Sequence, residues 1–211
     1  MDCKELLNLL YQMYPNAGCE LEYFSPFSFL CAVILSAQTT DKAVNKVTKE
    51  LFSRYKTIDS LANANRNEIM QIIAPIGLMK NKSEYIIKLA NIVKNKYNGI
   101  IPTKREELLQ LPGVGRKTAN VYLAQIYNVP AIAVDTHVNR VSKRLGLALE
   151  EDSVLEVENK LMEYFDKEDW IRAHHGLLFL GRYKCLAKKP ECQTCLLKKN
   201  CKYWKEINEN E

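Results

Sequence analysis

The sequence of 211 residues has no long apolar run and no segment of low complexity. Its longest uninterrupted apolar segment is Phe29–Leu35, whereas a helix that crosses a bilayer needs about 20 consecutive apolar residues. We therefore expect no membrane role. The first residues, Met1–Glu5, do not have the pattern of a secretory signal, which favours a cytoplasmic location.

Strict alternation of apolar and polar residues, which is typical of a half-buried strand, is also lacking. Apolar residues instead recur at helical spacing in the segment 6–13, in the buried segment 29–34 and in the segment 43–51, which Thr40 is placed to cap. Further helical patterns run near residues 57–63, 66–74, 82–97, 104–110, 116–127, 136–145, 152–165 and 168–182. Prolines fall between these segments, where they can end helices. The sequence thus predicts an all-α fold.

Net charge is small, at +5, but it is unevenly distributed. Residues 182–205 contain eight Lys or Arg and one acid, Glu191, so the rest of the chain is slightly negative. A run of this kind is usually a solvated surface, but it is also typical of a protein that binds a polyanion. A chain of this length can form one large domain or two small ones.

Glycine is infrequent, with eight in the chain, yet two of them lie in the segment Leu111-Pro112-Gly113-Val114-Gly115-Arg116-Lys117. Helical patterns on both sides predict two short helices that pack as a hairpin around this turn. The two glycines can adopt backbone conformations closed to other residues, so that amides of the turn and of the next helix converge on one phosphate. A turn needed only for packing is the alternative. Lys117 would lie beside the phosphate, as a contact or as a nucleophile.

Asp135 is a second candidate catalytic residue, because the chain can bring it back to Lys117. The helix from Lys117 to Tyr127 rises about 15 Å. An extended segment from Val129 to Asp135 could return the chain by about 20 Å. An isolated aspartate in this position usually caps the helix that follows, here at Thr136, and the two roles are compatible.

Cysteine is uncommon, with seven in the chain, but four lie close together as Cys185, Cys192, Cys195 and Cys201. The odd total and the lack of an export signal favour a metal site over disulfides. The spacing C-x6-C-x2-C-x5-C leaves structural zinc and an iron–sulfur cluster equally open. Cys31, in an apolar segment, is predicted to belong to the core.

Four motifs in this order make the chain resemble the endonuclease III family of helix-hairpin-helix DNA glycosylases. They are Leu35–Asp41, the glycine hairpin, Val134–Val138 and the four cysteines. The resemblance implies a six-helix barrel domain over residues 19–129 that includes the hairpin. It also implies a second, discontinuous helical domain of residues 1–18 and 130–211, with a [4Fe-4S] cluster on Cys185, Cys192, Cys195 and Cys201 and a cleft between the domains.

The function that the resemblance implies is removal of oxidised pyrimidines by a bifunctional DNA N-glycosylase and AP lyase. In that family a lysine at the position of Lys117 attacks the sugar C1′ and expels the base, and the resulting imine favours β-elimination of the 3′ phosphate. An aspartate in the Val-Asp-Thr-His context of Asp135 takes a proton and stabilises the cationic sugar. The expected partner is double-stranded DNA that contains damaged pyrimidines or abasic sites, bound by a monomer in the nucleoid.

Extrusion of a damaged base leaves a gap that the protein must fill. Gln38, at the predicted end of a helix, and Leu78, in a turn, match the residues with which the family fills this gap. Without the resemblance, Gln38 would be a surface or capping residue and Leu78 a loop anchor. The resemblance implies further DNA contacts from Gly113, Val114, Gly115, Arg116, His137, Lys188 and Lys189, and a structural role is the alternative for His137.

Two other functions remain open from the sequence. The first is a monofunctional glycosylase for mismatched or alkylated bases, which Lys117 disfavours because such an enzyme activates water and needs no lysine. The second is a non-catalytic DNA-binding module with structural zinc, which the joint occurrence of Lys117 and Asp135 disfavours.

Overall fold

The computed structural model describes residues 1–208, which form twelve α-helices and four 3-10 segments and contain no strand. The all-α prediction is therefore confirmed. No helix in this part of the chain is both long enough and apolar enough to cross a membrane. The chain divides into two compact units. The central unit is Glu20–Asn128, and the terminal unit combines Met1–Cys19 with the chain from Val129 onward.

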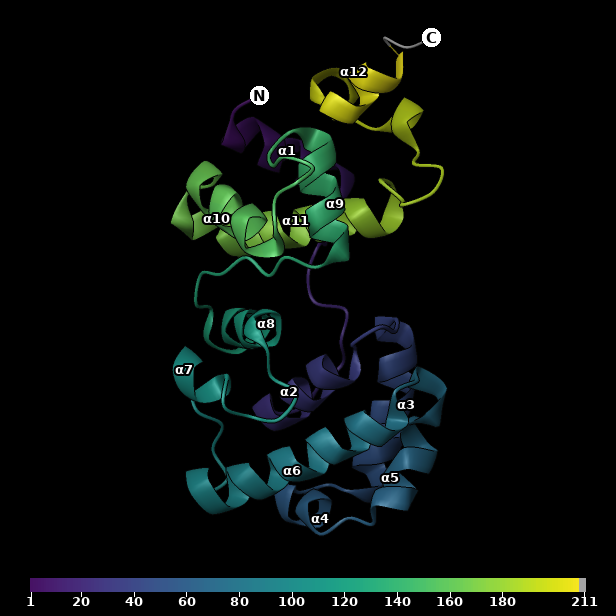
Figure 1. The fold of residues 1–211 in the computed structure, drawn as a ribbon, viewed down its shortest axis with the longest axis vertical. Helices are drawn as coiled ribbons and strands as arrows, with labels where there is room; N and C mark the ends of the chain where they lie inside the picture. Colours follow the sequence, from purple (N-terminus) through teal and green to yellow (C-terminus); the bar gives the residue numbers. More distant parts are fainter. Residues whose placement is uncertain (209–211) are drawn as a thin grey trace. The chain divides into compact units, whose positions relative to one another are not determined.

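The central unit is built around helix α2, which is buried along all of its length except its first residue, Pro26. Every side chain from Phe27 to Leu35 is buried, because α3, α6 and α8 all pack against α2 (Figure 1). Ser25 caps the helix through a reciprocal pair of bonds with Ser28. The helices of this unit are α2 (Pro26–Leu35), α3 (Asp41–Arg54), α4 (Ile58–Ala62), α5 (Arg66–Ile73), α6 (Met79–Tyr97), α7 (Arg105–Leu108) and α8 (Arg116–Tyr127).

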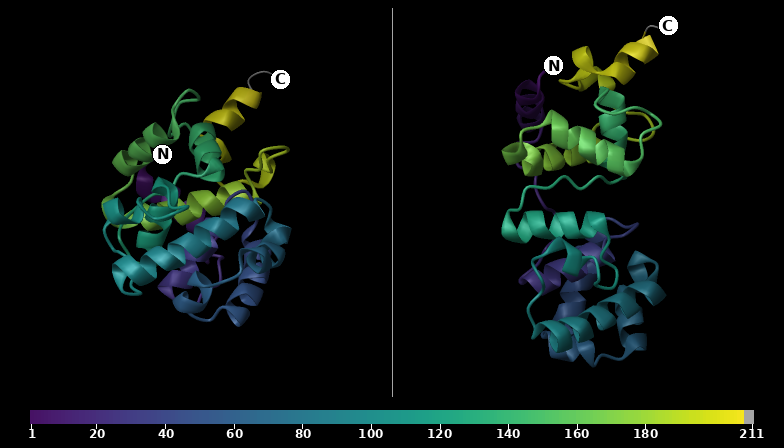
Figure 2. Two further views of the ribbon diagram at one scale, coloured as in Figure 1. Left: turned by 60° about the horizontal axis from the view of Figure 1, so that its bottom comes forward. Right: turned by 60° about the vertical axis from the view of Figure 1, so that its left-hand side comes forward.

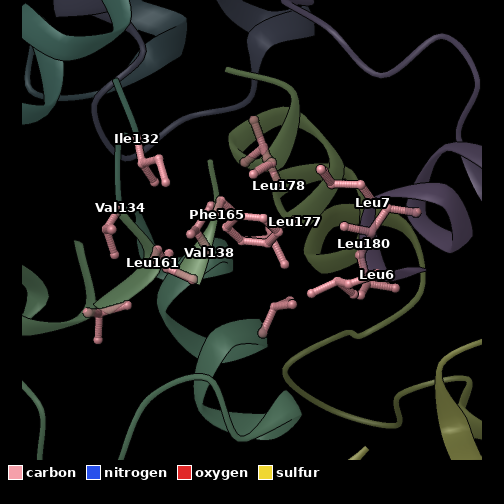
Figure 3. Packing of buried hydrophobic residues seen from close by; sticks show 14 of the residues in the cluster. Leu6, Leu7, Ile132, Val134, Val138, Leu161, Phe165, Leu177, Leu178 and Leu180 are labelled. Carbon is pink, nitrogen blue, oxygen red and sulfur yellow. The ribbon is translucent and has the colours of Figure 1, made fainter. Parts of the chain in front are cut away.

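The terminal unit brings the first helix of the chain against one of its last helices, α1 against α11 (Figure 2). Its helices are α1 (Cys3–Met13), α9 (Thr136–Leu145), α10 (Val154–Tyr164), α11 (Trp170–Tyr183) and α12 (Lys202–Asn208). Leucines of α1 and α11 share one apolar core with residues of α9 and α10 and of the segment before α9 (Figure 3). Burial of these side chains is what holds the first residues of the chain to this unit.

Several helix limits differ from the sequence pattern. The segment predicted to be helical at 104–110 is a single turn, α7, and α6 begins at Met79, three residues before the pattern. Asn98 and Asn128 end α6 and α8 in the left-handed conformation. Asparagine accepts that conformation more readily than most residues, which explains why the two helices end at these positions. Helix α12 was not expected from the sequence.

Candidate active site and metal centre

The turn between α7 and α8 depends on one of its two glycines. Gly113 has φ +75°, which favours glycine, and a Cβ atom there would lie 3.0 Å from Ile34 Cγ2 and 3.1 Å from Tyr85 Cδ2. The turn is closed by the N–H of Val114, which donates to the carbonyl of Leu111 at 3.1 Å. Gly113 therefore lets the hairpin pack directly on α2 and α6.

Gly115 does not need glycine's conformational freedom. Its φ of −95° and ψ of −178° are open to any residue, so the prediction that both glycines adopt special conformations is wrong for this one. Gly115 is the N-cap residue of α8 and has no side chain to bond the first amides of the helix. Nothing lies within 4 Å of the place that its Cβ would occupy. The space beside the first turn of α8 is thus open.

Lys117 lies on this first turn, as the second residue of α8, and is exposed. Arg116 beside it is exposed as well, whereas the Val114 side chain is only 6% exposed and belongs to the core. The hairpin therefore presents two cationic side chains next to the open end of a helix, and Val114 presents only its backbone.

Asp135 is the N-cap residue of α9 in the terminal unit. Its Oδ1 atom accepts bonds from the backbone N–H groups of His137 and Val138, both at 2.8 Å. The four residues before it, 131–134, are all buried and anchor it in the core. The predicted capping role of Asp135 is confirmed.

Gln38 and Leu78 are both exposed residues of the central unit with left-handed backbone, at φ 59° and 50°. Gln38 does not end a helix as predicted: α2 ends at Leu35, and Gln38 lies in the turn that follows. Leu78 is the N-cap residue of α6 and its side chain is 50% exposed. A bulky residue in this backbone region is uncommon and costs about 1–3 kcal/mol.

The four cysteines line one small cavity of about 30 Å³ in the terminal unit. Cys185 follows α11, the next two lie at the ends of a 3-10 turn, and Cys201 precedes α12. Burial raises the pKa of the thiols of Cys192, Cys195 and Cys201, and the neighbouring cysteines raise it further. Four thiolates would therefore repel one another here unless a metal cation lay among them.

The distances between the sulfur atoms bear on which metal fits. In the described part of the chain, the only group of three or more metal-ligating atoms within 4.8 Å of one another is Asp166, Glu168 and Asp169. No three of the four cysteine sulfurs therefore lie within 4.8 Å of one another. A single tetrahedral zinc would hold its sulfurs about 3.8 Å apart. The cysteines are spaced more widely than one zinc ion requires.

The acidic group is bridged by Lys4, whose Nζ lies 2.7 Å from Asp166 Oδ2 and from Asp169 Oδ2.

Two arginines of α9 hold the cysteine loop, and the sequence analysis missed both. Arg140 donates to the carbonyls of Cys185 at 3.0 Å and Gly181 at 2.8 Å. Arg144 donates to the carbonyl of Leu186 at 2.7 Å and to Cys185 Sγ at 3.4 Å. Their spacing of four residues, which puts them on one helix face, was the available signal.

The basic run near the C-terminus divides into two kinds of residue. Lys184 bonds Thr194 at 2.9 Å and Lys198 bonds the carbonyl of Gln193 at 3.1 Å, so both stabilise the cysteine loop. Lys188 and Lys189 are exposed and form no ion pair with any residue that the structure describes. These two remain available to an anionic partner.

Comparison with known proteins shows one consistent family. The model of the HhH-GPD superfamily base excision DNA repair proteins matches residues 31–167. Endonuclease III of Bacillus subtilis (strain 168) is 50% identical over 196 residues, which are 93% of this chain and 90% of that protein. Endonuclease III of Haemophilus influenzae is 43% identical and covers 96% of each chain. A structure described as a trapped endonuclease III–DNA covalent intermediate superposes with a TM-score of 0.93 at 49% identity, over 97% of this chain and 96% of that one.

Proposed function

This chain belongs to the endonuclease III family of the HhH-GPD superfamily, and we infer that it is a bifunctional DNA N-glycosylase and AP lyase that removes oxidised pyrimidines. The observation that carries this function is the position of Lys117. It lies on the first turn of α8, beside helix amides that no N-cap side chain covers. Such amides bind phosphate, so a DNA strand held there would present its sugar to the lysine.

Lys117 is proposed as the nucleophile. Its neutral amine would form a bond from Nζ to the sugar C1′ while the glycosidic bond breaks and its electron pair leaves with the base, which takes up a proton. Nζ then loses a proton, the C1′–O4′ bond breaks so that the sugar ring opens and O4′ takes up a proton, and the imine forms between Nζ and C1′. The imine makes the C2′ hydrogen acidic, so that removal of that proton expels the 3′ phosphate. The relative captured as a covalent intermediate with DNA supports a covalent route here.

Asp135 is proposed to accept a proton during base loss and to stabilise positive charge on the sugar. Its Oδ1 atom is fixed by two backbone N–H groups, so the orientation of the whole carboxylate is set by the start of α9. A carboxylate fixed in this way loses little conformational entropy when it acts. Lys117 belongs to the central unit and Asp135 to the terminal unit.

We propose that Cys185, Cys192, Cys195 and Cys201 hold a [4Fe-4S] cluster. Four thiolate donors with sulfurs too far apart for one zinc ion fit a cluster of several irons. When bound, the cluster would supply a four-point cross-link that orders the loop. Arg140 and Arg144 would hold the first ligand through its backbone and sulfur. Iron and sulfide in the protein purified without oxygen would support this, and stoichiometric zinc without iron would exclude it.

DNA binding is proposed to use the backbone of the hairpin, two residues that fill the gap left by the extruded base, and basic side chains. The left-handed, exposed positions of Gln38 and Leu78 suit insertion into a stack, since neither side chain is needed for the core. Phosphate contacts are assigned to Gly113, Val114, Gly115, Arg116, His137, Lys188 and Lys189.

A panel of duplexes, each with one defined lesion, tests the substrate class. We expect base release and strand cleavage with an oxidised pyrimidine such as thymine glycol, and slow or no reaction with a mismatched adenine or an alkylated purine. A chain that released alkylated purines and left the strand uncut would be a monofunctional glycosylase instead.

A further inference from the structure

Lys82, on the buried face of α6, is a charged residue inside the central unit. It is 2% exposed, although lysine is almost never fully buried without a partner. Its Nζ atom donates to the backbone carbonyl of Ile76 at 3.0 Å. None of the carboxylates in the described chain forms an ion pair with it. Burial lowers the pKa of Lys82. The folded protein therefore buries the Lys82 ammonium, which costs free energy, and gains in return one hydrogen bond to a backbone carbonyl.

The carbonyl that Lys82 holds lies directly before the corner that carries Leu78. Gly77 has φ +67° and ψ 173°, a region open essentially to glycine alone, and Leu78 follows with φ +50°. The backbone N–H of Lys82 donates to the carbonyl of Leu78 at 3.0 Å. Lys82 thus forms hydrogen bonds on both sides of Gly77. Its side chain bonds the carbonyl of Ile76, and its backbone N–H bonds the carbonyl of Leu78.

A corner of two unfavourable backbone conformations persists only where its surroundings fix it. The Leu78 side chain is half exposed and contributes little to the core, so its own packing does not fix its backbone conformation. A buried charge is a weak source of stability, since an apolar residue of similar volume often serves as well or better. The Lys82 bond is better explained by the conformation that it imposes on the corner than by stability of the fold.

We propose that Lys82 is a positioning residue for Leu78: its ammonium fixes the Ile76 carbonyl and thereby holds Leu78 projecting from the surface before DNA arrives. This inference rests on the proposed role of Leu78 in filling the gap that the extruded base leaves. With the corner fixed in advance, the protein does not have to order it while the base is being unstacked. Lys82 itself need not touch DNA.

The test compares Lys82→Met, Leu78→Ala and the double variant in single-turnover reactions. One substrate is a duplex with a central thymine glycol, and the other is an abasic site in a single strand, where no stack must be opened. We expect Lys82→Met to slow excision from the duplex about tenfold, or about 1.4 kcal/mol, and to leave cleavage of the single strand unchanged. The double variant should be no slower on the duplex than the slower single variant.

Ser83→Ala is the matched control, because Ser83 is equally buried on α6 but its hydroxyl bonds the carbonyl of Lys80 within the helix. It should leave the duplex rate unchanged. Gly77→Ala perturbs the same corner by backbone conformation alone, since nothing lies within 4 Å of the added Cβ. It should slow the duplex reaction selectively, as Lys82→Met does, and so tests the corner even if the buried substitution prevents folding.

The outcomes separate this inference from the proposed function. If Leu78→Ala lost the same fraction of the wild-type rate on both substrates, the gap-filling role itself would be overturned. A selective defect in Leu78→Ala, together with independent, multiplicative effects in the double variant, would overturn only the positioning role of Lys82. Normal duplex rates in both Lys82→Met and Gly77→Ala would also overturn it.

Discussion

Replacing Asp135 by asparagine and by alanine should separate its two roles. The Oδ1 atom of Asp135 accepts two backbone N–H groups at 2.8 Å at the start of α9. Asparagine keeps an oxygen that can accept the same bonds, and it caps helices about as well as aspartate. Alanine keeps neither the cap nor the charge. Both variants therefore lack the carboxylate, but only Asp135→Asn keeps the helix cap.

The magnitudes follow from the cap geometry. Loss of a capping side chain costs about 0.5–2 kcal/mol, and two short bonds in a partly buried site place Asp135→Ala near the upper end, at about 2 kcal/mol. Asp135→Asn should cost less than about 0.5 kcal/mol on the same grounds. Urea unfolding followed by circular dichroism measures both values. In the glycosylase assay the two variants should be similarly slow, because neither has a carboxylate to accept a proton.

Cleavage of a preformed abasic site gives the decisive contrast. Asp135→Asn should keep part of this lyase activity, since no base has to be expelled. An Asp135→Asn protein as unstable as Asp135→Ala would refute the argument from the cap. Glycosylase activity near the wild-type rate in Asp135→Asn would refute the chemical role, because capping would then be the whole function of the residue.

Three further changes test other parts of the structure. Gly181→Ala should destabilise the protein by about 1–3 kcal/mol in urea, because its Cβ would lie 2.8 Å from His137 Cβ in the packed contact of α11 with α9; unchanged stability would show that this contact can relax. Lys4 lowers the pKa of Asp169, so their pairing should stabilise the protein above the ordinary aspartate pKa of about 4 and be lost as the pH falls below it. Lys4→Met should therefore be less stable than wild type at pH 7 and approach it near pH 2, whereas a constant difference would contradict the pairing. Changing the Lys188–Lys189 pair to glutamate should weaken binding to damaged and undamaged duplexes alike and reduce the salt dependence, as fluorescence anisotropy would show, and an unchanged salt slope would place the contact elsewhere.

Features encoded in short segments were predicted well from the sequence. The apolar run of α2 was recognised as a buried helix, and Thr40 caps α3 as expected by accepting a bond from Ala43 N at 3.3 Å. The place of Asp135 before α9 was also correct. In each case the signal lies within a few residues of the feature, where helical spacing and capping chemistry operate.

Features that depend on contacts between distant segments were not predicted. Arg140 and Cys185 are far apart in the sequence, and only the packing of α9 against α11 brings them together. Backbone conformation was equally hidden: glycine at 115 suggested a special turn that the structure does not use, while Gln38 adopts left-handed backbone that its residue type does not signal. Nothing in the sequence around Lys82 signals its burial, which depends on the packing of the central unit.

Borohydride trapping tests the central claim, that Lys117 is the nucleophile. Borohydride added during turnover on a duplex with one oxidised pyrimidine should reduce the imine to a stable amine and leave a protein–DNA adduct on Lys117, located by peptide mass spectrometry. Lys117→Gln should form no adduct and cut no strand, yet still bind the duplex, because the backbone amides of the hairpin do not depend on that side chain. An adduct that persisted in Lys117→Gln, or one located on another amine, would contradict the account.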